Sequence, residues 1–127
     1  MKLIIGGYSQ GKLNYVLQKQ PSDDCVVWDG IPPCDKEGQD KTVIINHFHN
    51  WVKERMMHGG YPEKEIIAFL QKYPESIIIS DEIGNGIVPI NSFEREYRER
   101  TGRILVGLAN QAEEVVRVLC GIGQTIK

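Results

Sequence analysis

The sequence has little of what marks secreted, membrane-spanning or nucleic-acid-binding proteins. It contains three cysteines among 127 residues. None of them forms a C-x-x-C pair, so neither a disulfide framework nor a cysteine zinc site is indicated. No apolar run is long enough for a signal peptide or a membrane span, so a cytoplasmic protein is expected. The formal net charge of −2 argues against nucleic-acid binding driven by bulk charge.

What the sequence does contain is an alternation of β-branched runs and amphipathic stretches. Strands are predicted at 2–7, 25–30, 42–48 and 76–80, and helices at 11–20, 49–58, 63–73 and 91–112. The apolar sides of three of these helices are predicted to be Leu13, Val16 and Leu17; Ile66, Ile67, Leu70 and Tyr73; and Phe93, Tyr97, Ile104, Leu108 and Ala112. Asn91 and Glu94 fit a capping box at the start of the last helix. Residues 113–127 indicate a strand, a glycine turn and a short final strand. This order predicts one α/β domain over 1–127, a three-layer sandwich around a mainly parallel sheet with a C-terminal strand pair.

Residues 6–13, GGYSQGKL, follow the first strand with the spacing of a phosphate-binding loop. In such a loop the glycines let backbone N–H groups point at the phosphates, and the lysine reaches the terminal ones. The serine or threonine that would hold Mg²⁺ is Leu13, so a plain glycine-rich turn is the alternative. The candidate nucleotide-binding residues are Gly6, Gly7, Tyr8, Ser9, Gln10, Gly11, Lys12 and Leu13.

Polar side chains follow two of the predicted strands. Asp81 and Glu82 come directly after the run 76–80, and Asn46 and His47 end the strand before it. Ligands of α/β proteins bind at the carboxyl ends of parallel strands, so both acids are candidates for acid–base chemistry. The alternative is that they are solvated loop acids or helix caps. Asn46 would bring no negative charge to a cation.

The three histidines, His47, His49 and His58, lie close together in the sequence. No acid or cysteine is spaced to complete a set of metal ligands with them, so no metal site is predicted. His47 and His49 are expected to diverge, on opposite sides of a strand or at its end. Surface histidines are the simpler interpretation, although a histidine at a strand tip can titrate near neutral pH.

A run of alternating charge, EREYRER, occupies residues 94–100. It is typical of a solvated helix face with ion pairs four residues apart, such as Glu94 with Arg98. The alternative is that Arg95 and Arg98 contact the phosphate of a ligand.

Residues 81–103 together resemble the bifunctional adenosylcobinamide kinase/adenosylcobinamide-phosphate guanylyltransferase family of cobalamin biosynthesis. That family has an N-E-V-G-x-G-I-V-P segment and then a helix of the form N-x-x-x-R-x-[FY]-R-[DE]-x-x-G-R. The residues in register are Glu82, Gly84, Gly86, Ile87, Val88, Pro89, Asn91, Arg95, Tyr97, Arg98, Gly102 and Arg103. The family's initial G-G-x-x-S-G-K-S is similar to residues 6–13, and its L-V-D-C-L-T-L-W-V is similar to IINHFHNWV at 44–52.

The resemblance implies a P-loop nucleoside-triphosphate-hydrolase-like fold. It also implies GTP or ATP and a cobinamide as ligands, with Lys12 and Glu82 as the catalytic residues that are retained. Family members form trimers, so a homo-oligomer is expected.

The sequence departs from the family at positions that matter for nucleotide chemistry. Leu13 replaces the loop serine, Asn46 the acid of the middle strand, and Leu105 and Val106 an Asn-Gln pair. The family's long segment with a guanylylated histidine is reduced to residues 30–41, which contain no histidine. A covalent guanylyl intermediate needs that nucleophile, so guanylyl transfer is expected to be lost. Weak or altered kinase activity is expected, and Mg²⁺ binding is left open. The alternatives are a non-catalytic scaffold or regulatory protein, or a kinase for another small substrate.

Overall fold

The computed structural model describes residues 1–20, 23–32, 41–83 and 91–127. Its elements, in chain order, are β1 (Lys2–Gly6), α1 (Lys12–Lys19), β2 (Cys25–Asp29), β3 (Thr42–Asn46), α2 (Phe48–Met57), α3 (Pro62–Lys72), β4 (Ile77–Asp81), α4 (Ser92–Gln111), β5 (Glu114–Leu119) and β6 (Ile122–Thr125). The predicted segments Gly30–Lys41 and Asp81–Pro89 fall partly outside these residues, including Gly84, Gly86, Ile87, Val88 and Pro89 of the family-like segment.

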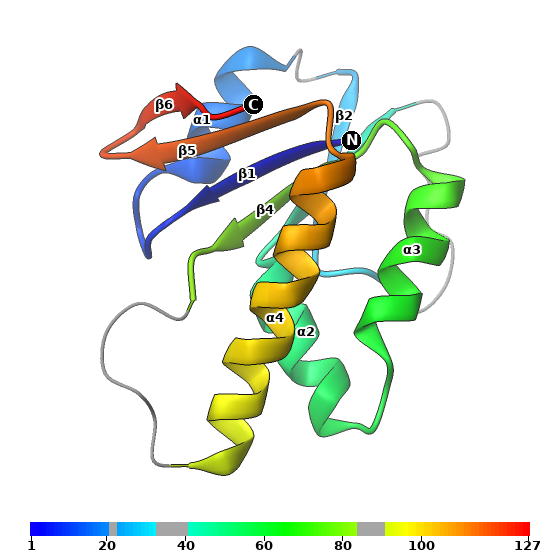
Figure 1. The fold of residues 1–127 in the computed structure, drawn as a ribbon. Coiled ribbons are helices and arrows are strands. Elements are labelled where there is room, and N and C mark those ends of the chain that lie inside the picture. Colours follow the sequence, from blue (N-terminus) through cyan, green and yellow to red (C-terminus); the bar gives the residue numbers. More distant parts are fainter. Residues whose placement is uncertain (21–22, 33–40, 84–90) are drawn as a thin grey trace.

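The strands form one six-stranded sheet in the order β2-β3-β4-β1-β5-β6 (Figure 1). All neighbouring strands run parallel except β5 and β6, which form an antiparallel pair. The predicted parallel sheet and C-terminal strand pair are thereby confirmed. The register pairs Gly6 with Asp81 and Asp29 with Asn46. The carboxyl ends of β1, β2, β3 and β4 therefore meet at one edge of the sheet.

Both faces of the sheet are covered, but unequally (Figure 1). Helices α2, α3 and α4 cover one face over the larger core, to which Leu3, Ile45 and Ile78 contribute. The short helix α1 covers the other face over a smaller core. That core contains Ile4, Val16, Ile44, Ile77, Ile79, Val116 and Val118. Successive side chains of a strand point to opposite faces, so the isoleucine runs fill both cores.

Two local expectations need correction. Leu17 and Ile67, which the helical spacing places on apolar faces, are 38% and 55% exposed. Each lies one position beyond a residue that does face the sheet, because helical neighbours are rotated by about 100°. Asn91 caps α4 as predicted, since its Oδ1 accepts from the backbone N–H of Phe93 at 2.8 Å. The Glu94 carboxylate, however, pairs with Lys53 at 2.8 Å.

None of the helices in the described ranges is both long and apolar enough to cross a membrane.

Candidate functional site

A groove of about 580 Å³ lies at the carboxyl edge of the sheet, beside the glycine-rich loop. We call it the loop groove. It is lined by Tyr8, Ser9, Gln10, Gly11, Lys12, Leu13, Asn14, Asn46, His47, His49, Asn50, Ile79, Ser80 and Asp81. The fold thus brings the predicted loop together with three of the predicted strand-end residues, Asn46, His47 and Asp81.

Two glycines of the loop occupy backbone positions that a residue with a side chain would not easily adopt. Gly11, at the N-cap of α1, has a φ of 82°, in the left-handed region that favours glycine. At Gly6 a Cβ atom would stand 2.6 Å from the carbonyl oxygen of Val118 on the neighbouring strand. Leu13, at the position of the usual hydroxyl residue, packs against the smaller core. It offers no oxygen to a metal ion.

Lys12 is buried at the start of α1, where its ammonium group has two partners. Nζ donates to the carbonyl oxygen of Gly7 at 2.7 Å and lies 2.6 Å from Oδ1 of Asp81. A lysine is seldom buried unless it is paired, so Asp81 is what permits its burial. The ion pair holds a positive charge beneath the loop, at the amino end of a helix.

His49 is buried on the other side of the Asp81 carboxylate. Its Nδ1 accepts from the backbone N–H of Asp81 at 3.1 Å, so that nitrogen is unprotonated. Its Nε2 lies 3.3 Å from Oδ2 of Asp81. Burial lowers the pKa of His49 below its ordinary value, against the opposing effect of Asp81. Asp81 is therefore held between Lys12 and a neutral imidazole.

Tyr97 of α4 holds the backbone of His49 in place through a hydrogen bond. Its hydroxyl donates to the carbonyl oxygen of His49 at 3.0 Å in the buried core. Burial raises the pKa of Tyr97 to about 12, so the hydroxyl stays protonated and remains a donor. A residue from the family-like helix is thus connected to the loop groove through His49.

The expectation of a surface histidine is confirmed for His47, which is exposed, but it is wrong for His49, and the two rings do not diverge. β3 ends at Asn46 and α2 begins at Phe48, so the two histidines do not lie on a strand. Their rings meet edge to face with centroids 6.1 Å apart, and His49 is buried. The HFHNWV segment carries the only signal for this, because His49 is three residues before the buried Val52.

The two adjacent acids, Asp81 and Glu82, turn to different partners. Glu82 pairs with Arg117 of β5, whose Nη2 donates to Oε2 at 3.1 Å. Its backbone N–H donates to the carbonyl oxygen of Gly6 at 2.8 Å. Glu82 is not among the residues that line the loop groove. Its catalytic role stays a prediction.

Among the described residues that line the loop groove, Arg95 and Arg98 of α4 are not found. The charge run instead supplies ion pairs on the helix surface. Arg100 lies 3.6 Å from Glu96, as expected for a pair four residues apart, and 2.8 Å from Glu63 of α3. The contact of either predicted arginine with a ligand phosphate stays a prediction.

The β5–β6 turn is attached to the loop by a residue whose role the motif does not indicate. The side-chain oxygen of Gln10 accepts from the N–H of Cys120 at 2.7 Å, and its carbonyl oxygen accepts from Gly121 at 2.8 Å. Cys120 and Gly121 both have positive φ, as in a two-residue hairpin turn. The C-terminal strand pair therefore supports the loop from one side.

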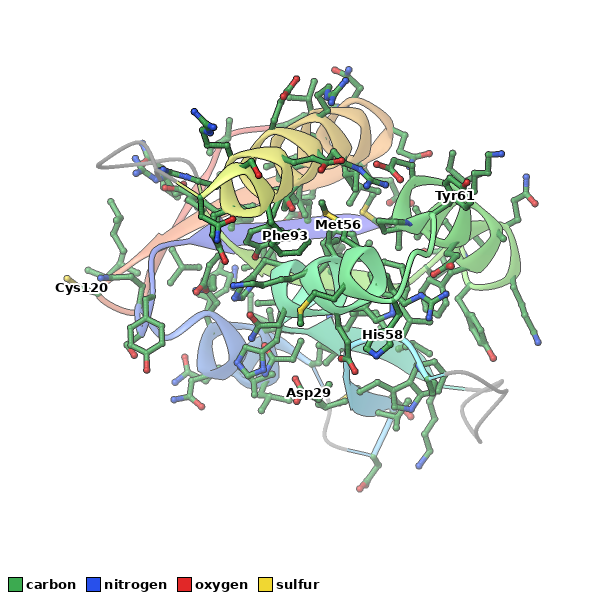
Figure 2. The ribbon with its side chains drawn as sticks, turned by 90° about the horizontal axis from the view of Figure 1, so that it is seen from below. Asp29, Met56, His58, Tyr61, Phe93 and Cys120 are labelled. Atoms are coloured by element: carbon green, nitrogen blue, oxygen red, sulfur yellow. The ribbon has the colours of Figure 1, made fainter. Side chains whose placement is uncertain are left out.

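A second groove, of about 940 Å³, lies along the carboxyl end of β2. We call it the β2 groove. It is lined by Val27, Trp28, Asp29, Gly30, Ile31, Pro32, His47, Trp51, Glu54, Arg55, His58, Glu65 and Ala68. Figure 2 shows Asp29 and His58 on one side of α2 and Phe93 on the other, between α2 and α4. Nδ1 of His47 lies 2.6 Å from Oδ1 of Asp29, a partner that sequence reasoning missed.

Among the residues that the structure describes, His47 is the one that lines both grooves. It is half exposed and occupies the position just before α2, with a φ of 53°. Since the register pairs Asp29 with Asn46, Asp29 reaches the residue that follows Asn46. No pattern in the sequence specifies that register.

The sheet order, the unequal helix layers and the glycine-rich loop after β1 define a P-loop-like α/β protein. The family model for cobinamide kinase / cobinamide phosphate guanyltransferase matches residues 31–126, and the chain belongs to this family. The matched range begins after the glycine-rich loop, so residues 6–13 are not part of that match.

Two curated relatives are bifunctional adenosylcobalamin biosynthesis proteins. The chain is 41% identical to the one from Salmonella typhimurium over 63 residues, which are 49% of this chain and 35% of the relative. It is 38% identical to the one from Escherichia coli over 65 residues, 50% of this chain and 36% of the relative. The matches therefore span about a third of each relative's length.

Proposed function

We propose that the chain binds the phosphates of a nucleoside triphosphate, GTP or ATP, in the loop groove, as a divergent cobalamin-biosynthesis protein of this family. The observation that carries the proposal is the buried ammonium group of Lys12 beneath a glycine-rich loop at the start of α1. Backbone N–H groups and a helix N-terminus favour anions there. A phosphate oxygen is a stronger acceptor than the Gly7 carbonyl and would replace it at Nζ.

The residues of the groove fit Mg²⁺ poorly. Leu13 offers no oxygen, and Asn46 is neutral. Asp81, the acid nearest the loop, already balances Lys12 at 2.6 Å. In the ranges that the structure describes, no group of three or more His, Cys, Asp or Glu residues could hold a metal ion. The retained contribution to phosphoryl transfer is thus the charge of Lys12, and a kinase with this site would be slow.

Guanylyl transfer through a covalent histidine is absent under this proposal, because residues 30–41 contain no histidine to serve as the nucleophile. Cobinamide is the acceptor that the family's description supports. Assembly into a homo-oligomer remains a prediction, which light scattering of the purified protein would check.

Calorimetric titration with GTP and with ATP, each with and without Mg²⁺, tests the proposal. We expect binding in all four arms, with a small effect of Mg²⁺. Lys12→Ala should weaken binding at least about tenfold, the value of a charge-assisted hydrogen bond. Lys19→Ala, which removes an exposed lysine from the same helix, should leave binding unchanged. Absence of binding at millimolar nucleotide would refute the proposal.

A non-catalytic homologue is the second candidate, and the contacts of Lys12 favour it. Lys12 is satisfied by Gly7 and Asp81 without any ligand. A groove in that state can serve as a structural element of a scaffold. This candidate predicts a specific oligomer or partner complex that survives Lys12→Ala.

A further inference from the structure

We propose that the Asp29–His47 pair is the base that takes the proton from the acceptor hydroxyl during phosphoryl transfer. The inference rests on the proposed nucleotide site and adds residues that the motif and the family match do not assign to a role. Its basis is the position of His47 between the loop groove and the β2 groove, with Asp29 as its orienting partner.

The contact with Asp29 selects the tautomer that the neutral ring adopts. A carboxylate accepts hydrogen bonds only, so the Nδ1 that lies 2.6 Å from Oδ1 must carry the proton. The neutral ring then has its lone pair on Nε2. A base oriented by a third group in this way is the arrangement of nucleophile-activating dyads.

The two grooves supply what the reaction needs on either side of His47. The loop groove holds Lys12, where the terminal phosphate of the nucleotide would lie. The β2 groove has an apolar wall that includes Trp28, Trp51 and Ile31, suited to the body of an acceptor larger than water. His47 stands where a hydroxyl of such an acceptor would approach the phosphate.

The step balances without a further reactant. The acceptor oxygen forms a bond to the γ-phosphorus, and the bond from that phosphorus to the β,γ-bridging oxygen breaks. The nucleoside diphosphate leaves with those electrons. The proton of the hydroxyl moves to Nε2 of His47, and Asp29 balances the positive charge of the imidazolium.

Other titratable groups face His47 from the surrounding elements. His49 of α2 touches its ring edge, and behind His49 lie Asp81 of β4 and Lys12 of α1. The β2 groove adds Glu54, Arg55 and His58 of α2 and Glu65 of α3, of which Arg55 and Glu65 pair with each other at 2.7 Å. Asp29→Asn removes one carboxylate and leaves all these other groups in place. Its effect on transfer therefore reports on the Asp29–His47 pair.

The backbone at His47 is a second observation in favour of a role beyond packing. A φ of 53° is uncommon for a residue other than glycine, and such residues concentrate at functional sites. Its side chain is half exposed, so burial in the core does not offset the energetic cost of this backbone conformation.

The experiment compares His47→Gln and Asp29→Asn with the wild-type protein. Labelled GTP or ATP is the phosphoryl donor, and cobinamide and water are the two acceptors. We expect His47→Gln to lower single-turnover transfer to cobinamide about 100-fold, with nucleotide affinity within about twofold. Asp29→Asn should lower it about tenfold and shift the acidic limb of the pH–rate profile. Glu99→Gln, which neutralises an exposed acid of α4, should change neither.

A spectroscopic readout separates orientation of the ring from general loss of activity. Nitrogen NMR of the wild-type protein should show His47 with the proton on Nδ1, and Asp29→Asn should abolish that preference. Transfer by His47→Gln at the wild-type rate would refute the proposal. So would a covalent nucleotide or phosphate on His47, seen in the intact mass.

The failure of this inference can be told from the failure of the nucleotide site. If the wild-type protein binds nucleotide but transfers phosphate to neither acceptor, the base is refuted and the nucleotide site stands. If no nucleotide binds, both are refuted.

Discussion

Two contacts of equal length at one edge of the sheet join a carboxylate to a basic side chain, and they differ in burial. The Asp81–Lys12 contact is 2.6 Å long, and the side chains are 17% and 8% exposed. The Asp29–His47 contact is also 2.6 Å long, with side chains 77% and 51% exposed. In the first pair, each charge depends on the other, because neither has enough water around it. In the second pair, water replaces a lost partner.

The difference in burial suits the two pairs to different roles. The Asp81–Lys12 pair is suited to positioning a ligand, and the Asp29–His47 pair to the proton transfer proposed above. The buried pair is completed by His49 and Tyr97, so its geometry is tied to three helices, α1, α2 and α4, and to the strand β4. A group held in this way can present a fixed charge to a phosphate. The exposed pair has less support: the His47 ring contacts His49 edge to face, and both side chains of the pair are otherwise largely open to water.

The largest predicted effect comes from breaking the buried pair. Asp81→Ala leaves the ammonium group of Lys12 buried without a counter-charge, and it removes the partner of His49. We expect the free energy of unfolding to fall by about 3 kcal/mol or more. Urea denaturation measures this. Asp24→Ala, at an exposed acid before β2, should change it by less than about 0.5 kcal/mol. Equal losses of unfolding free energy in the two variants would contradict the special importance of the buried Asp81–Lys12 pair.

The second-largest loss of stability is expected at Gly6, where the backbones of β1 and β5 lie close together. In Gly6→Ala the new Cβ would meet the carbonyl oxygen of Val118 at 2.6 Å, so β1 or β5 must move. We expect a loss of about 2 kcal/mol in thermal or urea unfolding. Gly107→Ala is the matched control, since nothing lies within 4 Å of a Cβ there and α4 is helical. That change should stabilise the protein by up to about 1 kcal/mol.

Removing the support of the buried pair should have a moderate effect. Tyr97→Phe deletes the hydroxyl that donates to the carbonyl oxygen of His49 and keeps the ring. A buried hydrogen bond contributes about 1 kcal/mol, and we expect that loss in urea denaturation. Tyr61→Phe, on a ring that is 64% exposed, should be neutral. A neutral Tyr97→Phe would show that α4 does not hold His49 in place.

The buried pair should also give stability a dependence on pH. Burial lowers the pKa of His49 in the folded protein below its ordinary value of 6.5, so the unfolded chain binds more protons between these two values. The stabilising effect is thus complete above pH 6.5 and is lost as the pH falls through the lower folded-state pKa. Unfolding free energies measured at stepwise lower pH should decrease.

His49→Asn keeps an acceptor for the Asp81 N–H and removes the titration, so it should flatten this dependence. The same slope in the wild-type protein and in the variant would exclude His49 as its source.

The smallest expected effect on stability is that of Asp29→Asn. An exposed ion pair contributes about 0 to 1 kcal/mol, so the unfolding free energy should change by less than about 0.5 kcal/mol. The result sharpens the comparison with Asp81→Ala, because the two contacts have the same length. A loss as large as that from Asp81→Ala would mean that exposure does not distinguish the pairs.

Most secondary structure could be predicted because its signals are local. The run IIIS predicts β4, the stripe Tyr97, Ile104 and Leu108 predicts α4, and Asn91 marks where α4 begins. The glycine-rich loop was also predictable from the spacing of residues 6–13. The faces of the elements were less certain, as Leu17 and Ile67 demonstrate.

The partners of the polar residues could not be predicted in the same way. Asp81 and Glu82 are adjacent in the sequence, yet one reaches Lys12 and the other Arg117. Consecutive residues at a strand end point in opposite directions, and the sequence does not say which direction leads to the loop. The prediction of His49 failed because the strand was extended to Phe48, two residues past its end at Asn46.

The sequence by itself determined the α/β alternation, the capped last helix and a lysine below a glycine-rich turn. These features depend on periodicity and on residues within a few positions of one another. The tertiary structure alone decided that β4 lies beside β1, and therefore that Asp81 balances Lys12. It also decided that β2 pairs with β3 in the register that brings Asp29 to His47. Strand order and register follow from how the whole core packs, which no short segment of the chain specifies.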